Sequence, residues 1–227
     1  MRSNHNRSLI SPTHLLTYLP TYLLKERNMK IAVIGATGTV GKAVVQQLAA
    51  RHDIIEVGNS SGQYQVDITD IHSVERLFEQ IGKVDAIVST AGKLHFGPLQ
   101  ELTPEKFQVG LRDKLMGQIN LALVAQHHLN DGGSITLTSG ILSHEPILQG
   151  VNASTVNAAL DGFVRAAAIE LKRGIRINIV SPTVLQESLA SYGPFFYGFE
   201  AAPASRVALA YSRSVEGAQT GQVYRVW

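Results

Sequence analysis

Short apolar runs alternate along the chain with longer segments in which apolar residues recur every three or four positions. The short runs are typical of buried parallel strands and occupy residues 30–34, 54–57, 84–88, 134–138 and 175–180, with a last one near Val223. The longer segments predict amphipathic helices over residues 40–51, 70–81, 103–129, 152–172 and 203–214. This alternation with short connections predicts a single α/β domain with a Rossmann-like, doubly wound parallel sheet.

The first 28 residues differ from the rest of the chain. They contain no glycine and one acid, Glu26, and two prolines interrupt their apolar patches. Met29 directly precedes the first predicted strand and is a natural beginning. We therefore expect residues 1–28 to be an N-terminal extension, disordered or translated from upstream of the true start, and residues 29–227 to form the domain. A transit peptide is the alternative, because arginine and serine are present and no acid precedes Glu26.

Composition and charge exclude several classes of protein. The chain has no cysteine, which excludes disulfides and Cys-ligated zinc, and we predict no metal site. No stretch approaches the roughly 18 to 20 apolar residues of a membrane-spanning helix, so we expect a soluble, cytoplasmic protein. The formal net charge is +2, but residues 1–28 contribute +3 of it, leaving −1 for the domain. This near-neutral domain gives no indication of nucleic-acid binding.

A glycine-rich turn with the spacing G-x-x-G-x-x-G connects the first predicted strand to the first predicted helix. Glycines there permit a tight turn and let the backbone approach a pyrophosphate at the helix N-terminus, where free N–H groups and the helix dipole favour an anion. The position between a strand and a helix at the start of a doubly wound sheet predicts a dinucleotide site. Its expected cofactor contacts are Gly35, Thr37, Gly38, Thr39, Val40 and Gly41.

The end of the second predicted strand bears on the choice of dinucleotide. An acid at that end would bind the ribose hydroxyls of NAD. Glu56 lies one or two residues too early, and the strand is followed by Asn59, Ser60 and Ser61, whose side chains can bond a 2′-phosphate. We therefore expect NADP(H) to be favoured over NAD(H), although the segment has no arginine.

From Met29 to Trp227 the chain resembles the short-chain dehydrogenase/reductase family in several motifs, in the correct order. GATGTVG looks like the cofactor loop, VDITD like the segment that contacts the adenine, STAG like the turn beside the cofactor, and LTSG like the strand end with the catalytic serine. NAALDGF, RINIVSP and TGQVYRV are similar to the later helix and strands of the family. The resemblance implies further cofactor contacts from Asp67, Ile68, Thr90, Ala91, Gly92 and Pro182.

The same resemblance implies an atypical catalytic site. In the family a tyrosine exchanges a proton with the substrate, a lysine four residues later lowers its pKa, a serine orients the carbonyl, and an asparagine from the preceding helix completes a relay. Aligned on these motifs, Ser139 takes the serine position, Asn157 the lysine position, Lys114 the asparagine position and Ala153 the tyrosine position. This exchange is similar to the ketoreductase domains of polyketide synthases. Ser139, Lys114 and Asn157 are thus the implied catalytic residues, and His144 is a candidate substitute acid.

The function that the resemblance implies is an NADP(H)-dependent oxidoreductase acting on an unidentified carbonyl or alcohol. The apolar and aromatic segment 181–203 corresponds to the substrate loop of the family, and it indicates either a small, partly apolar substrate or a lid folded on itself. The alternative is a catalytically inactive NAD(P)-binding sensor or interaction protein, because Ala153 cannot donate a proton. The resemblance also implies a homodimer or tetramer that packs through the two long helices.

Overall fold

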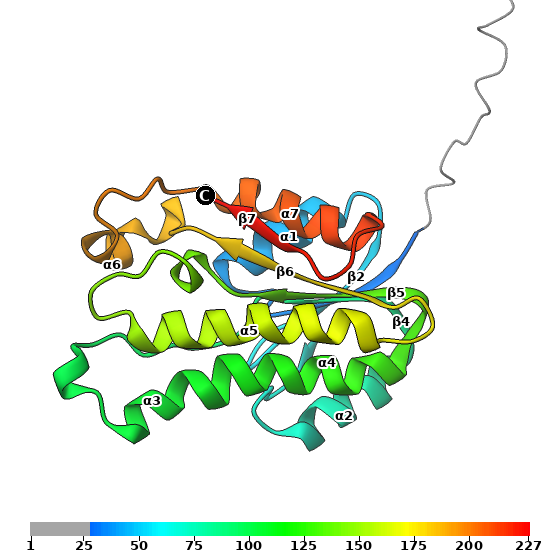
Figure 1. Cartoon of the computed structure of the whole chain (residues 1–227). Coiled ribbons are helices and arrows are strands. Elements are labelled where there is room, and N and C mark those ends of the chain that lie inside the picture. The colour runs from blue at the N-terminus through cyan, green and yellow to red at the C-terminus, as the bar shows by residue number, and fades with distance from the viewer. Residues whose placement is uncertain (1–27) are drawn as a thin grey trace, which may run out of the picture.

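Seven parallel strands form the centre of the structure, a computed structural model that describes residues 28–227 (Figure 1). Their order in the sheet is β3-β2-β1-β4-β5-β6-β7. The strands are β1 (Lys30–Ile34), β2 (Asp53–Gly58), β3 (Tyr64–Gln65), β4 (Val84–Ser89), β5 (Leu129–Thr138), β6 (Arg176–Pro182) and β7 (Val223–Val226). The predicted doubly wound parallel sheet is confirmed. The expectations for residues 1–27 lie outside the described residues.

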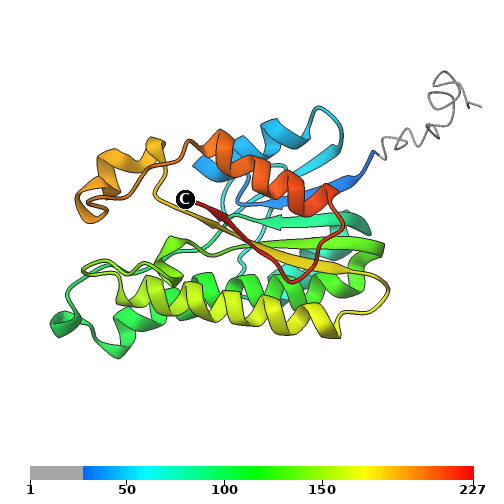
Figure 2. The same cartoon turned by 45° about the horizontal axis from the view of Figure 1, so that its top comes forward.

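Helices cover both faces of this sheet (Figures 1 and 2). One face packs against α2 (Ile71–Ile81), α4 (Gly117–His128) and α5 (Val151–Glu170), and the other against α1 (Thr39–Leu48) and α7 (Ala204–Glu216). Two further helices, α3 (Pro104–Gly110) and α6 (Leu189–Tyr192), lie at one end of the sheet. No helix in the described range 28–227 is both long and apolar enough to cross a membrane.

Local sequence signals account for several helix boundaries. The Asp70 side chain accepts a hydrogen bond from the His72 N–H, and the Thr103 side chain accepts one from the Lys106 N–H, so both act as N-caps. Pro104 occupies the first turn of α3, where its missing N–H has no helical partner to lose. The predicted starts of these two helices are confirmed.

Two predicted elements differ in the structure. The helix expected over 103–129 is divided into α3, a π-helical segment at Leu111–Met116 and α4, because wider backbone turns occupy the middle. The strand expected at 134–138 begins earlier, at Leu129, and its pairing with β4 shifts register between Val84 and Ala86. Gly132, with φ of 74°, lies inside this irregular stretch rather than in a separate turn.

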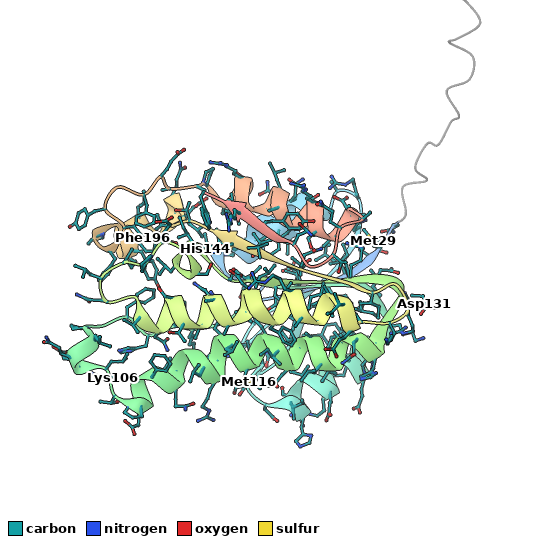
Figure 3. The ribbon with its side chains drawn as sticks, in the orientation of Figure 1. Met29, Lys106, Met116, Asp131, His144 and Phe196 are labelled. Atoms are coloured by element: carbon teal, nitrogen blue, oxygen red, sulfur yellow. The ribbon has the colours of Figure 1, made fainter. Side chains whose placement is uncertain are left out.

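The strand order reverses between β1 and β4, because β2 continues the sheet on one side of β1 and β4 on the other. In open α/β sheets this switch point opens a crevice at the carboxyl ends of the strands. Figure 3 shows Phe196 and His144 at that end of the molecule, and Met29 and Asp131 at the opposite end.

Candidate functional site

The glycine-rich turn after β1 is tightly packed. Gly35 has φ of 84°, a conformation that favours glycine, and a Cβ on Gly41 would lie 2.0 Å from the Gly35 carbonyl oxygen. The N–H of Gly35 and the N–H of Ala36 both donate to the Val57 carbonyl, at 2.8 and 3.2 Å, which ties the turn to β2. The spacing of the glycines is therefore a steric requirement of the turn between β1 and α1.

A cavity of about 420 Å³ opens beside this turn. We call it the glycine-loop cavity. It brings together nine of the fifteen predicted cofactor contacts: Gly35, Thr37, Gly38, Asn59, Asp67, Ile68, Thr90, Ala91 and Gly92. Predicted contacts that do not line this cavity are Thr39, Val40, Gly41, Ser60, Ser61 and Pro182. The first three of these begin α1, behind the lining residues.

Two side chains of the glycine-loop cavity are fixed by hydrogen bonds. The Thr90 hydroxyl lies 3.1 Å from the carbonyl oxygens of Ile34 and Gly35, and thus joins the end of β4 to the glycine turn. The Asp67 carboxylate accepts bonds from the hydroxyl and the N–H of Thr69, at 2.8 and 2.9 Å. These bonds from Thr69 lower the pKa of Asp67, so the carboxylate is charged at the edge of the cavity.

The end of β2 supplies amide and hydroxyl groups to this region. Asn59 lines the glycine-loop cavity, whereas the exposed Glu56 does not. The Ser61 hydroxyl lies 3.5 Å from the Thr37 hydroxyl, next to the glycine turn. Neutral donors therefore border the cavity where an acid would favour a ribose hydroxyl pair.

A second cavity, of about 510 Å³, adjoins the first. We call it the Ser139 cavity. Gly92 and Lys93 line both cavities, which makes the two cavities neighbours at the end of β4. The Ser139 cavity brings together Ser139, which directly follows β5, Lys114 of the π-helical segment, Asn157 of α5 and Pro182 of β6. Its apolar lining consists of Leu94, Phe96, Val109, Ile141, Leu142, Val184, Leu185, Tyr192 and Phe196.

Lys114 is buried at the inner end of this cavity. It lies in the π-helical segment, its exposed fraction is 7%, and its Nζ donates to the Ser139 carbonyl oxygen and to Asn157 Oδ1, both at 2.8 Å. Burial lowers the pKa of Lys114 to about 8, against the opposing effect of the Asp161 carboxylate. The ammonium is thus held by two fixed acceptors and loses its proton more easily than an exposed lysine does.

Several hydroxyl groups at the same end of the sheet are buried and have no hydrogen-bond partner among the described residues. They include those of Ser139 and Thr183, which both line the Ser139 cavity. An unpaired buried hydroxyl costs free energy unless a bound molecule satisfies it. Because the residues that carry two of them line the Ser139 cavity, these hydroxyls are candidates to contact a polar group of a ligand.

The position of Ser139 is fixed from below by Gln118 and Thr138. The Gln118 amide donates to the Thr138 carbonyl and accepts from the Thr138 N–H, both at 2.8 Å. The Thr138 hydroxyl donates to the Ser89 carbonyl at 2.5 Å and lies 2.6 Å from the Tyr211 hydroxyl. Burial raises the pKa of Tyr211, so this phenol stays neutral and serves the packing of β5 against α7.

Two residues that matter to the site were missed from the sequence. Asn152 is buried, accepts from the His95 N–H at 3.0 Å and donates to the Phe107 carbonyl at 2.8 Å, so it fixes the loop that carries Leu94 and Phe96. Asp161 is buried one turn beyond Asn157 on α5, and neither carboxylate oxygen has a hydrogen-bond partner among the described residues. The sequence did contain a signal for both residues, because each is a polar residue within the apolar stripe of the predicted helix.

Ala153 and His144 both lie outside the cavity lining. Ala153 is fully buried in a small apolar cluster with Ile141 and Leu142. The exposed His144 has partners for both ring nitrogens: Nδ1 lies 2.8 Å from the Ser143 hydroxyl, and Nε2 lies 2.9 Å from the Arg225 guanidinium. Since Arg225 can only donate, His144 Nε2 is an acceptor. Since His144 lies outside the cavity lining and its Nε2 faces the Arg225 guanidinium, the described residues do not favour it as a substitute acid, and that interpretation stays a prediction.

An aromatic segment covers the Ser139 cavity. It begins and ends at a bridge between Leu185 and Ala202, and includes α6, which Figure 1 shows beyond the strand ends. The Tyr192 ring lies 5.7 Å from the Phe96 ring, centroid to centroid. Apolar and aromatic side chains therefore surround the polar floor made by Ser139 and Lys114.

Comparison with known sequences gives a consistent result. A family model described as enoyl-(acyl carrier protein) reductase matches residues 21–224. The chain is 31% identical over 180 residues to versicolorin reductase stcU of Emericella nidulans, covering 72% of this chain and 67% of that protein. It is 31% identical over 176 residues to versicolorin reductase 1 of Aspergillus parasiticus, covering 73% and 64%. The chain thus spans about two thirds of the length of these two curated relatives.

Solved structures share the whole described fold. The protein lin1944 from Listeria innocua is 53% identical with a TM-score of 0.86, and the match covers 88% of this chain and 100% of that one. A small-chain dehydrogenase in complex with NADPH is 26% identical with a TM-score of 0.78, covering 88% and 96%.

Proposed function

Because this chain belongs to the short-chain dehydrogenase/reductase family of oxidoreductases, we propose that it uses NADP(H) to interconvert a carbonyl and an alcohol on a small, apolar or aromatic substrate. The observation that carries the proposal is the junction of two cavities at Gly92 and Lys93. One has the glycine turn that suits a pyrophosphate, and the other has the buried, unpaired Ser139 hydroxyl that suits a carbonyl oxygen.

The residues present fit a dinucleotide. The turn at Gly35 and Gly41 leaves no room for side chains, so a phosphate can approach the backbone N–H groups at the start of α1. Asp67 and Ile68 border the cavity where the resemblance expects the adenine, and Thr90, Ala91 and Gly92 lead toward Ser139. When bound, the nicotinamide ring would supply or accept a hydride at the substrate carbon.

The preference for NADP(H) rests on the end of β2. Asn59 lines the glycine-loop cavity and no carboxylate from β2 does, so nothing there repels a 2′-phosphate. The segment that follows β2 has no arginine, which limits how strongly a 2′-phosphate would be bound there. We therefore propose a moderate preference for NADPH over NADH.

Ser139, Lys114 and Asn157 have different roles at the substrate end of the site. Ser139 offers its free hydroxyl to the substrate oxygen, and Lys114 and Asn157 form a buried pair behind it. The apolar lining and the aromatic segment exclude water from the carbonyl, which strengthens these polar contacts. We propose that Ala153, which cannot exchange a proton, stands where most family members have tyrosine.

The test is cofactor binding followed by turnover. The purified full chain is titrated with NADPH and with NADH by fluorescence, and NADPH oxidation is then followed with a panel of aromatic ketones and aldehydes. We expect binding of both cofactors, tighter for NADPH, and turnover of some aromatic ketones. Ser139→Ala should lose turnover while binding NADPH as before. A chain that binds neither cofactor would overturn the proposal, and binding without any turnover would favour the sensor alternative.

Exposed apolar residues on α4 and α5 support a proposal for assembly. Leu123 on α4 and Ile169 on α5 are exposed by 44% and 85%, and a groove of about 310 Å³ runs between the two helices. We propose that two copies pack through α4 and α5, as the family resemblance implies. Light scattering should give the mass of a dimer or tetramer, and Ile169→Lys should shift it toward the monomer.

A further inference from the structure

The Lys114 ammonium has one N–H bond to spare. An ammonium carries three donors, and two of them are given to the Ser139 carbonyl and to Asn157 Oδ1. No third acceptor is found for it among the described residues. Lys114 also lines the Ser139 cavity, so a substrate oxygen bound at the Ser139 hydroxyl would lie beside a positioned cation.

The rest of the cavity offers few other proton donors. Its ionisable lining residues, within the described range, are Lys114, Lys93 and Tyr192. Lys93 is exposed, and Tyr192 is 42% exposed on the aromatic segment with its ring against Phe96. Lys114 is the buried one of the three and the one fixed by hydrogen bonds to two other residues of the site.

Asp161 gives this lysine a buried counter-charge. Both of its oxygens are buried and unpaired among the described residues, one helical turn beyond Asn157, and its negative charge raises the pKa of Lys114. A buried carboxylate without hydrogen bonds is costly, and a nearby cation offsets part of that cost. Asp161 thus opposes the loss of the lysine proton that burial promotes.

We propose that the Lys114 ammonium itself delivers the proton to the substrate oxygen, and that Asp161 is a positioning residue that keeps Lys114 charged. This inference rests on the proposed function and deepens it, since it assigns the proton source. When bound, NADPH would supply a hydride to the carbonyl carbon, and the electron pair of the C=O bond would move to oxygen. That oxygen takes the proton from Nζ: an O–H bond forms, an N–H bond breaks, and a neutral amine remains. After the product leaves, a proton from the solvent restores the ammonium.

The charged and titratable groups that surround Lys114 come from α5, from the cavity lining, from the π-helical segment and from the neighbouring helices α3 and α4. Asp161 comes from α5, whose next ionisable residue, Arg165, is exposed. Lys93 and Tyr192 face the same cavity, and on the π-helical segment Asp113 accepts from the Lys93 N–H while Arg112 is exposed. Glu105 and Lys106 of α3 are exposed, and the histidines of α4 lie at its far end. Asp161 is therefore the group whose removal tests the pairing.

The first measurement does not depend on activity. The lysine side chains of the full chain are labelled with carbon-13 and titrated by NMR. We expect the Lys114 signal, identified by its loss in Lys114→Met, to titrate near pH 8, and to titrate at lower pH in Asp161→Asn. Lys83→Met, an exposed lysine at the amino end of β4, is the matched control and should leave the Lys114 titration unchanged. A Lys114 that titrates like an exposed lysine, or ignores Asp161→Asn, would overturn the proposal.

The second measurement is the pH profile of ketone reduction. Only charged Lys114 can give a proton, so kcat/KM should fall as pH rises through its pKa, and Asp161→Asn should move this fall to lower pH. Lys114→Met should lower kcat about 10²- to 10⁴-fold with a far smaller change in NADPH affinity. Lys114→Arg keeps the charge but holds its proton, so it should be nearly as slow and lack the fall at high pH.

These outcomes separate the inference from the proposed function. Failure to bind NADPH would end the proposed function, whatever the NMR titration shows. Normal binding and turnover in Lys114→Met, or a high-pH fall that vanishes in Tyr192→Phe instead, would overturn only the proton assignment. Melting curves establish whether each variant is folded. If Asp161→Asn does not fold, the NMR titration and the pH profile of the wild type still test whether Lys114 delivers the proton.

Discussion

Lys114 Nζ and Asn157 Oδ1 lie 2.8 Å apart inside the domain, although 43 positions separate the two residues in the sequence. The lysine comes from a π-helical segment and the asparagine from α5. Their contact joins the two helical elements beneath the Ser139 cavity and places a nearly fully buried cation at the centre of the proposed site. The consequences reach stability as well as chemistry.

Burial of Lys114 should make stability depend on pH. Its pKa falls from 10.5 to about 8 on folding, so between these values the unfolded chain binds a proton that the folded chain has released. The contribution of Lys114 to the free energy of unfolding therefore rises with pH over this window, by at most ~3 kcal/mol. Urea titrations at several pH values give the free energy of unfolding, which should rise with pH in this window for the wild type but not, through this residue, for Lys114→Met. Lys83→Met should keep the wild-type slope, and parallel curves for the wild type and Lys114→Met would contradict the prediction.

Asn59→Asp should reverse the cofactor preference. The new carboxylate would stand at the end of β2, where it repels a 2′-phosphate and can bind the ribose hydroxyls of NADH. We expect NADPH affinity to fall about tenfold, which corresponds to about 1.4 kcal/mol, with NADH affinity kept or improved. Fluorescence titration measures the dissociation constants of NADPH and NADH. The wild type is the control, because asparagine has nearly the same shape as aspartate and no charge. Equal losses for the two cofactors would show that Asn59 does not face the phosphate.

Gly41→Ala should damage the glycine turn. The added Cβ would lie 2.0 Å from the Gly35 carbonyl oxygen, and backbone cannot yield as a flexible side chain does. We expect a loss of roughly 1–3 kcal/mol in stability together with weaker NADPH binding. Gly162→Ala on α5 is the control, because a Cβ at that position would meet no atom within 4 Å outside the backbone of its own helix. That change should be neutral or stabilising by up to about 1 kcal/mol, since alanine is the better helix former.

Ala153→Tyr should overpack the apolar cluster beside the Ser139 cavity. Ala153 is fully buried between Ile141 and Leu142, and a phenol needs space that these side chains occupy. We expect a destabilisation of roughly 1–3 kcal/mol, visible as a lower melting temperature. Ala153→Ser, which adds one oxygen atom, should cost less. A tyrosine variant as stable as the wild type would show that the cluster has room for the ring.

Much of the fold follows from local patterns. The apolar runs and helical stripes predict the parallel sheet, and Asp70 and Thr103 predict where two helices begin, because capping depends on residues a few positions apart. The irregular elements cannot be predicted from local sequence patterns. The π-helical turns around Lys114 and the register shift in β5 depend on packing against distant elements, which the local sequence does not contain.

For the site, the sequence by itself determined which chemical groups are present: the glycine turn, Ser139, Lys114 and Asn157. Only the tertiary structure decided their environment. It buried Lys114 against two acceptors, left the Ser139 hydroxyl unpaired, engaged both nitrogens of His144, and placed Asp161 near the lysine. The physical reason is that desolvation and charge pairing act between residues that only folding brings together, and these effects set the proton affinity of each group.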